Sequence, residues 1–182
     1  MELIKLSKTE KRYLEPLKAL YFDAFPEIER KPFPYMEDLC ASGKMEILAV
    51  VENGEFIGLD INMLSENAAI LDYFAILPEK RSGGYGSRAL RLILERFQTQ
   101  PLIFEIETQD PSAENAVDRK RRKDFYLRNG VKETGIFANV YHTDFELLTQ
   151  DGRLTFALYL DVLHSVLGEE GVALLNPTQL YL

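Results

Sequence analysis

One stretch of the chain decides the fold: Leu71-Asp72-Tyr73-Phe74-Ala75-Ile76-Leu77, then Pro78-Glu79-Lys80-Arg81-Ser82-Gly83-Gly84-Tyr85-Gly86, then the helical pattern of residues 87–97. An apolar strand leads into a basic, glycine-rich loop, and the loop opens a helix. Backbone N–H groups at a helix N-terminus lack partners inside the helix, and the helix dipole adds positive potential there. The pattern predicts a site for a pyrophosphate-sized anion at residues 81–87. The alternative is an ordinary Gly-Gly turn, because short glycine motifs also occur by chance.

Length and composition indicate one globular domain. The chain has 182 residues, of which 46% are hydrophobic and 27% charged. The net charge of −8 argues against nucleic-acid binding, which relies on a basic surface, and it fits a cationic small substrate better than an anionic one. No apolar run approaches the ~20 residues that a membrane helix needs, and the first residues have no long apolar core. We therefore expect neither a membrane partner nor a signal peptide.

Cysteine and histidine usage bears on location and metal chemistry. The single cysteine, Cys40, cannot form an internal disulfide, so the chain fits a reducing cytoplasm, and Cys40 is interpreted as a packing residue. His142 and His164 are far apart in the sequence and form no metal-spaced cluster. We therefore expect no metal cofactor.

The N-terminal half predicts strands, hairpins and one longer helix. Alternating or apolar patterns predict strands over residues 2–6, 45–51, 55–64 and 68–77. Asn53-Gly54 is typical of a two-residue hairpin turn. Thr9 is expected to cap a helix whose inner face carries Leu14, Leu17, Tyr21, Ala24 and Phe25. Three prolines then interrupt the pattern before a short helix over residues 35–41.

The C-terminal half predicts one more βα step and a closing set of strands. A helix over residues 87–97 leads to a strand over residues 102–107, which should run parallel to the strand before the helix. A helix over residues 115–129 should end at Gly130, and residues 131–134 and 137–148 read as closing strands. Thr155 should cap a last helix over residues 156–167 whose inner face carries Phe156, Leu160, Leu163 and Leu167. The tail should be ordered where residues 180–182 dock.

This order of elements, with two motifs, resembles the GCN5-related N-acetyltransferase (GNAT) superfamily. Arg81-Ser82-Gly83-Gly84-Tyr85-Gly86 matches its Q/R-x-x-G-x-G/A acetyl-CoA loop, and Lys123-Asp124-Phe125-Tyr126-Leu127-Arg128-Asn129-Gly130-Val131 is similar to its later helix. The resemblance covers residues 1–148. It implies a single N-acetyltransferase domain over residues 1–182, with a C-terminal helix and tail at residues 149–182. It also implies an α/β fold with a mixed, mostly antiparallel sheet, splayed central parallel strands and flanking helices.

The resemblance further implies that acetyl-CoA is the co-substrate. Loop amides and Arg81 would hold the pyrophosphate, and the strand that ends at Ile76 would pair with the pantetheine arm and supply an oxyanion-stabilising N–H near Ala75 or Ile76. The expected cofactor-binding residues are Phe74, Ala75, Ile76, Arg81, Ser82, Gly83, Gly84, Tyr85, Gly86, Ser87, Arg119 and Arg122.

Tyr126 is the expected general acid. A phenol with a pKa of about 10 stays protonated at neutral pH and can protonate the departing thiolate. Without the resemblance, Phe125-Tyr126 at helical spacing fits core packing as well.

The base has three carboxylate candidates, Asp72, Glu105 and Glu107. An alkyl ammonium must lose a proton before it attacks, and a carboxylate can take that proton directly or through water. Strand alternation places Glu105 and Glu107 on one face. A solvent-facing row, a salt bridge or ordered water alone are the open alternatives.

A run of five basic residues, Arg119-Lys120-Arg121-Arg122-Lys123, has two interpretations. It is a solvated helix face, or it faces CoA on the side of Tyr126, which Arg119, Arg122 and Lys123 share at 3.6 residues per turn. Arg119 and Arg122 depart from the family pattern, where an asparagine and a small residue are frequent. Such arginines would reach a phosphate or an anionic substrate group.

The predicted function is transfer of an acetyl group from acetyl-CoA to a primary amine of a small molecule or peptide, by direct attack in a ternary complex. Residues 26–35 and 137–148 would select the acceptor, and the C-terminal helix offers a surface for a homodimer. The alternative is a non-catalytic acyl-CoA-binding sensor or interaction module. A nicotinamide-dependent oxidoreductase is disfavoured: Gly84-x-Gly86-x-x-Ala89 fits the dinucleotide fingerprint, but hairpins precede it and no further βα units follow.

Overall fold

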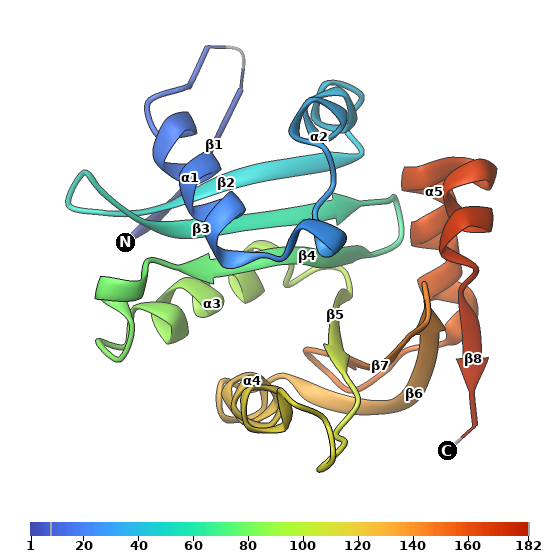
Figure 1. Cartoon of the computed structure of the whole chain (residues 1–182). Helices are drawn as coiled ribbons and strands as arrows, with labels where there is room; N and C mark the ends of the chain where they lie inside the picture. The colour runs from blue at the N-terminus through green and yellow to red at the C-terminus, as the bar shows by residue number, and fades with distance from the viewer. Residues whose placement is uncertain (8, 182) are drawn as a thin grey trace. The chain divides into compact units, whose positions relative to one another are not determined.

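The structure, a computed structural model, describes residues 1–7 and 9–181. Its residues form two compact units. The first unit comprises Met1–Leu64 and Leu71–Arg96, and the second comprises Ser65–Ile70 and Phe97–Leu182. Together they give the mixed α/β, mostly antiparallel architecture that the sequence predicts, with helices against the strands (Figure 1).

The first unit is built on consecutive antiparallel strands. β1 (Glu2–Lys5), β2 (Met45–Glu52) and β3 (Glu55–Leu64) pair in order, followed by the greater part of β4 (Ala69–Ile76). The turn between β2 and β3 has φ of 53° at Asn53 and 79° at Gly54, which confirms the predicted two-residue hairpin. Val50 pairs with Gly58 and Val51 with Phe56, so Ile57 is the extra residue of a bulge in β3.

Helices cover both faces of the strands of this unit, so β2 and β3 are almost wholly buried (Figure 1). Its helices are α1 (Leu14–Ala24), η1 (Glu27–Glu29), α2 (Phe33–Ala41), η2 (Pro78–Lys80) and α3 (Tyr85–Arg96). Tyr13, at the start of α1, stacks on Phe56 of β3. On the other face of the sheet, Arg96 of α3 binds Glu46 of β2.

The second unit has strands in the order β5-β7-β6-β8. They are β5 (Leu102–Glu107), β7 (Thr143–Thr149), β6 (Lys132–Val140) and β8 (Thr178–Leu180), and each pairs antiparallel with its neighbour. The first two residues of β4 belong to this unit, run parallel to β5, and begin where the Ala69 N–H donates to the Pro101 carbonyl at 2.9 Å. The helices are α4 (Ala116–Arg128) and α5 (Phe156–Leu175).

The two helices of this unit meet opposite faces of β5. Tyr126 of α4 packs on Phe104, and Tyr159 of α5 bonds to Glu105. Successive strand residues point to opposite faces, so α4 lies on the Phe104 face and α5 on the Glu105 face.

Several predicted caps and turns are confirmed. Gly130 follows α4 with a φ of 92°, and the Thr155 hydroxyl accepts the Leu158 N–H at the start of α5. The tail docks through β8, which pairs with β6; the prediction for Leu182 lies outside the described residues.

Three local predictions are wrong. Thr9 does not cap α1, because the Ser7 hydroxyl accepts its N–H in a separate turn and Tyr13 takes the N-cap position. Residues 137–148 are not one strand, since Tyr141 and His142 adopt positive φ and turn the chain from β6 into β7. The last helix continues past a break at Gly168 to Leu175. Its buried residues are Tyr159, Val162, Leu163, Val166 and Val172 rather than the predicted set, of which only Leu163 is buried.

Candidate functional site

The glycine-rich loop of the first unit presents unused backbone donors. Positive φ at Ser82 (66°) and Gly84 (74°) turns the chain from η2 into α3. The Arg81 N–H is used by the Pro78 carbonyl and the Arg88 N–H by the Gly84 carbonyl. Within the described residues, the N–H groups of Ser82 to Ser87 make no well-aligned hydrogen bond to a backbone carbonyl. Consecutive free donors at a helix N-terminus are the arrangement that binds phosphate groups.

Strand β4 leads into this loop, and its last residues lie close to the backbone of β3. The Nε atom of Arg81 donates to the Ile76 carbonyl at 3.1 Å, so the guanidinium is held where the strand ends. On the β3 side, a Cβ at Gly58 would overlap the Ala75 carbonyl oxygen and lie 3.1 Å from Cα of Ile76. Glycine at position 58 therefore sets the position of Ala75 and Ile76. Phe74 and Ala75 are half-buried.

Asp72, one of the candidate bases, is held by a lysine that the sequence analysis did not single out. Nζ of Lys31 donates to both carboxylate oxygens of Asp72, at 2.8 and 2.9 Å. The segment around Lys31 is fixed further by two phenols: Tyr21 donates to the Lys31 carbonyl, and Tyr73 donates to the Glu29 carbonyl while accepting the Lys31 N–H. Burial raises the pKa of both phenols, so they remain protonated donors.

In the second unit, the Tyr126 ring is buried at 7% exposure. Its centroid lies 5.0 Å from that of Phe104 and 5.4 Å from that of Phe125. The ring therefore packs in a core, as the alternative interpretation required. A ring fixed in this way also holds its hydroxyl in a defined place.

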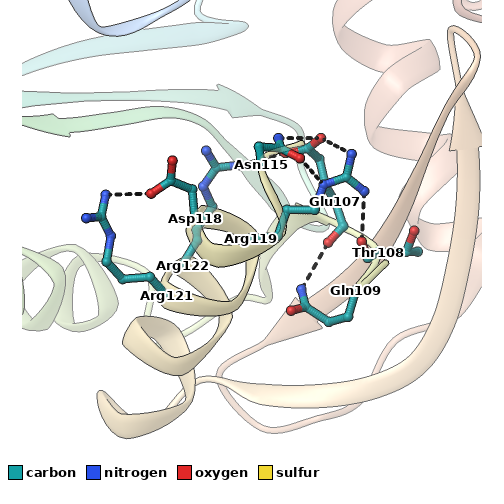
Figure 2. A network of polar contacts seen from close by, with 8 residues as sticks. All are labelled: Glu107, Thr108, Gln109, Asn115, Asp118, Arg119, Arg121 and Arg122. Atoms are coloured by element: carbon teal, nitrogen blue, oxygen red, sulfur yellow. Dashed lines mark hydrogen bonds and ion pairs between the residues drawn. The ribbon is translucent and has the colours of Figure 1, made fainter. Parts of the chain in front are cut away.

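Glu107 lies at the centre of a polar network (Figure 2). Arg119 binds its carboxylate at 2.8 Å and also donates to Asn115 and the Thr108 carbonyl, while Arg122 approaches Glu107 at 3.5 Å. The Asn115 amide donates to the same carboxylate. The network ties the first turns of α4 to the end of β5. The Arg122 side chain is 51% exposed and that of Arg119 only 19%, so Arg122 has more surface for another anion.

The other charged residues of the predicted set have different partners. The Glu105 carboxylate accepts a hydrogen bond from the Tyr159 hydroxyl. Lys123 binds Glu133 of β6 and Glu146 of β7, so its ammonium is directed at the strands of its own unit. Glu105 and Glu107 thus have partners on different helices, α5 and α4.

Nucleophilic and metal chemistry find no support in the described residues. Burial raises the pKa of the Cys40 thiol to about 11, so it is protonated at neutral pH. The described part of the chain has no group of three or more His, Cys, Asp or Glu side chains that could hold a metal ion. None of its helices is long and apolar enough to cross a membrane.

Comparison with known families decides the relationship of the chain. The model of the acetyltransferase (GNAT) family matches residues 14–128. The chain belongs to this family. As a GNAT acetyltransferase, it is an acyltransferase. A comparison with curated protein sequences finds no significant match.

Solved structures share this GNAT fold at low sequence identity. A protein described as a GNAT-family acetyltransferase from Bacteroides thetaiotaomicron has a TM-score of 0.75 and 19% identity, covering 92% of this chain and 99% of that one. An aminoglycoside 6'-N-acetyltransferase complexed with coenzyme A has a TM-score of 0.62 and 13% sequence identity, and the match covers 82% of this chain and 96% of that one. Arabidopsis thaliana Naa50, in complex with the bisubstrate analogue CoA-Ac-MVNAL, has a TM-score of 0.58 and 19% sequence identity, and the match covers 81% of this chain and 96% of that one.

Sequence reasoning missed the long-range partners. Lys31 and Tyr159 lie far from Asp72 and Glu105 in the chain, and no local motif joins either pair. A spacing signal existed for Tyr159 alone, since residues 159, 163 and 166 form a helical stripe of buried side chains.

Proposed function

We propose that this GNAT protein transfers the acetyl group of acetyl-CoA to a primary amine by direct attack in a ternary complex. The observation that carries the proposal is the row of unused N–H donors from Ser82 to Ser87 beside Arg81. The match to the acetyltransferase family supports it, as do relatives bound to coenzyme A or to a CoA bisubstrate analogue.

The loop fits the diphosphate of the cofactor. Amides of Ser82, Gly83, Gly84, Tyr85, Gly86 and Ser87 would bind its oxygens, and Arg81 would add charge-assisted hydrogen bonds. Backbone groups of Phe74, Ala75 and Ile76 would pair with the pantetheine amides. Of the two arginines of α4 in the predicted set, Arg122 is the better phosphate ligand, because three donor groups of Arg119 are used in the Glu107 network.

The proposed chemistry is one addition and one elimination. The amine lone pair forms a C–N bond with the thioester carbonyl carbon, and an N–H near Ala75 or Ile76 stabilises the oxyanion. The carboxylate takes one proton from the acceptor ammonium before this attack, directly or through water. The C–S bond then breaks, the thiolate takes the Tyr126 phenol proton, and the nitrogen of the adduct gives its surplus proton back to the phenolate. Attacking and departing groups lie on different sides of the tetrahedral carbon. An acid on the Phe104 face of β5 and a base on the Glu105 face suit this arrangement.

Glu105 is the preferred base among the three candidates. Asp72 gives both oxygens to the Lys31 ammonium, and Glu107 is held by two guanidinium groups. An acceptor ammonium would have to displace these cationic side chains to reach either carboxylate. Glu105 accepts a hydrogen bond from the neutral Tyr159 phenol, and we choose it as the base on this contact.

The proposed acceptor is a primary amine of a small molecule or a peptide. Of the similar structures, one is an aminoglycoside 6'-N-acetyltransferase and another is in complex with the bisubstrate analogue CoA-Ac-MVNAL. The test is a thiol-release screen with acetyl-CoA against kanamycin, spermine, lysine and the peptide MVNAL. Release with at least one amine, rising with pH toward the deprotonation of that amine, is the expected result. Tight acetyl-CoA binding without turnover on all four would instead support the sensor function.

We also propose a cytoplasmic location and, as one candidate assembly, a homodimer paired through α5. The single free cysteine supports the first. Exposed Leu174 and Tyr181 near the end of the chain support the second. Light scattering of the purified chain distinguishes monomer from dimer.

A further inference from the structure

We propose that Tyr159 of the C-terminal helix is a positioning residue that fixes the orientation of the Glu105 carboxylate, the proposed base. The inference rests on the proposed function. It adds a residue from α5, which lies outside the region 14–128 that the family model matches.

The hydroxyl of Tyr159 is committed to Glu105. Tyr159 is fully buried, and its hydroxyl donates to Oε1 of the Glu105 carboxylate. A phenol buried in a core needs a partner for its O–H, and a charged carboxylate gives the strongest hydrogen bond that a neutral donor can make. The contact therefore fixes the rotamer of Glu105.

The position of Tyr159 is itself well defined. Thr155 caps the helix start, with its hydroxyl accepting the Leu158 N–H at 3.2 Å, and the Phe156 ring lies 5.9 Å from the Tyr159 ring. Val162, Leu163 and Val166 continue the buried face of the helix beyond it. Because the donor is anchored in a packed helix, Glu105 is oriented by a rigid element.

Glu105 in turn belongs to a central strand. β5 pairs with β7, and Glu105 lies opposite Leu147. Glu107, two residues on, has arginine partners from α4 instead. The two carboxylates thus have different partners: Glu107 binds arginines of α4, and Glu105 accepts the hydrogen bond of the Tyr159 phenol.

The test is a double-mutant cycle on the full chain, with acetyl-CoA and the fastest amine among kanamycin, spermine, lysine and the peptide MVNAL. Tyr159→Phe should lower kcat about tenfold, with an unchanged acetyl-CoA Kd and KM. Glu105→Gln should lower kcat about a hundredfold. In the Glu105→Gln background, Tyr159→Phe should have no further effect, because the carboxylate it orients is gone. Tyr13→Phe, which removes the hydrogen bond from a buried phenol to the Gly54 carbonyl, is the matched control and should leave kcat unchanged.

Two results would overturn the inference while the proposed function stands. One is a wild-type rate in Tyr159→Phe, and the other is the same tenfold loss in both backgrounds, which indicates a general structural effect. A wild-type chain that acetylates none of the four amines overturns the proposed function and this inference together. Circular dichroism and acetyl-CoA Kd of each variant establish that the rates compare folded proteins.

Discussion

Asp60 on β3 shows how a single buried carboxyl group couples stability to pH. It is fully buried, accepts from the Asn62 amide at 2.9 Å, and lies on the same sheet face as Glu46, which binds Arg96. Its Oδ1 atom and that of Asn62 have no partner among the described residues. Burial raises the pKa of Asp60 from 3.8 to about 8. The carboxyl group is therefore protonated in the folded chain at neutral pH.

This buried acid predicts a pH-dependent effect of Asp60→Asn. Between pH 4 and pH 8, the folded state holds a proton that the unfolded state has lost, so stability falls as pH rises through this range. The uncharged variant does not lose stability in this way as the pH rises. Its free energy of unfolding should exceed that of the wild type by roughly 2 to 5 kcal/mol at pH 8, and by less at pH 5. Urea unfolding at the two pH values measures this, and a gain independent of pH would contradict a protonated Asp60.

Tyr126 predicts a rate effect without a binding effect. Tyr126→Phe keeps the ring against Phe104 and removes only the phenolic proton proposed for the thiolate. The kcat of the amine that responds in the screen should fall about a hundredfold, with the acetyl-CoA Kd unchanged. Steady-state kinetics and calorimetry test this, with Tyr13→Phe as the control. An unaltered kcat would contradict the acid role and indicate that Tyr126 only packs in the core.

At the scale of elements, the contact between β3 and β4 positions the strand proposed for pantetheine. Gly58→Ala would drive a Cβ into the Ala75 carbonyl and toward Ile76, so β4 must shift. The free energy of unfolding should fall by about 1 to 3 kcal/mol, and acetyl-CoA should bind more weakly. Gly43→Ala is the control, because its φ of 77° strains the chain while its Cβ meets open space. Equal acetyl-CoA affinity in both variants would contradict a role of β4 in binding the cofactor.

Most elements could be predicted because their signals are local. The Asn53-Gly54 turn, the Gly130 helix stop and the Thr155 cap each depend on residues within one turn of the chain. The turn between β6 and β7 escaped prediction because Tyr141 and His142 have positive φ without a glycine or proline to mark it. Thr9 does not cap the helix because its own backbone N–H donates to the Ser7 hydroxyl in a competing local turn.

At the scale of the whole molecule, the sequence identified the family through an ordered pair of motifs, and the family model confirmed it. The sequence did not predict which side chains bind one another in the candidate site. Lys31 meets Asp72 across 41 positions and Tyr159 meets Glu105 across 54. Such pairs depend on how strands and helices pack, which no local pattern specifies. They change the choice among the three candidate bases, so the structure contributes most to the proposed mechanism.

The central claim is that the backbone donors of residues 82–87 bind the diphosphate of acetyl-CoA. Calorimetric titration of the full chain with acetyl-CoA, in parallel with S-acetylpantetheine, tests it most directly, because the second compound keeps the thioester and lacks the diphosphate and nucleotide. We predict saturable one-to-one binding of acetyl-CoA and an affinity for S-acetylpantetheine at least about a hundredfold weaker, since charge-assisted hydrogen bonds to the loop are lost. No heat of binding with millimolar acetyl-CoA, or equal affinity for the two compounds, would contradict the claim.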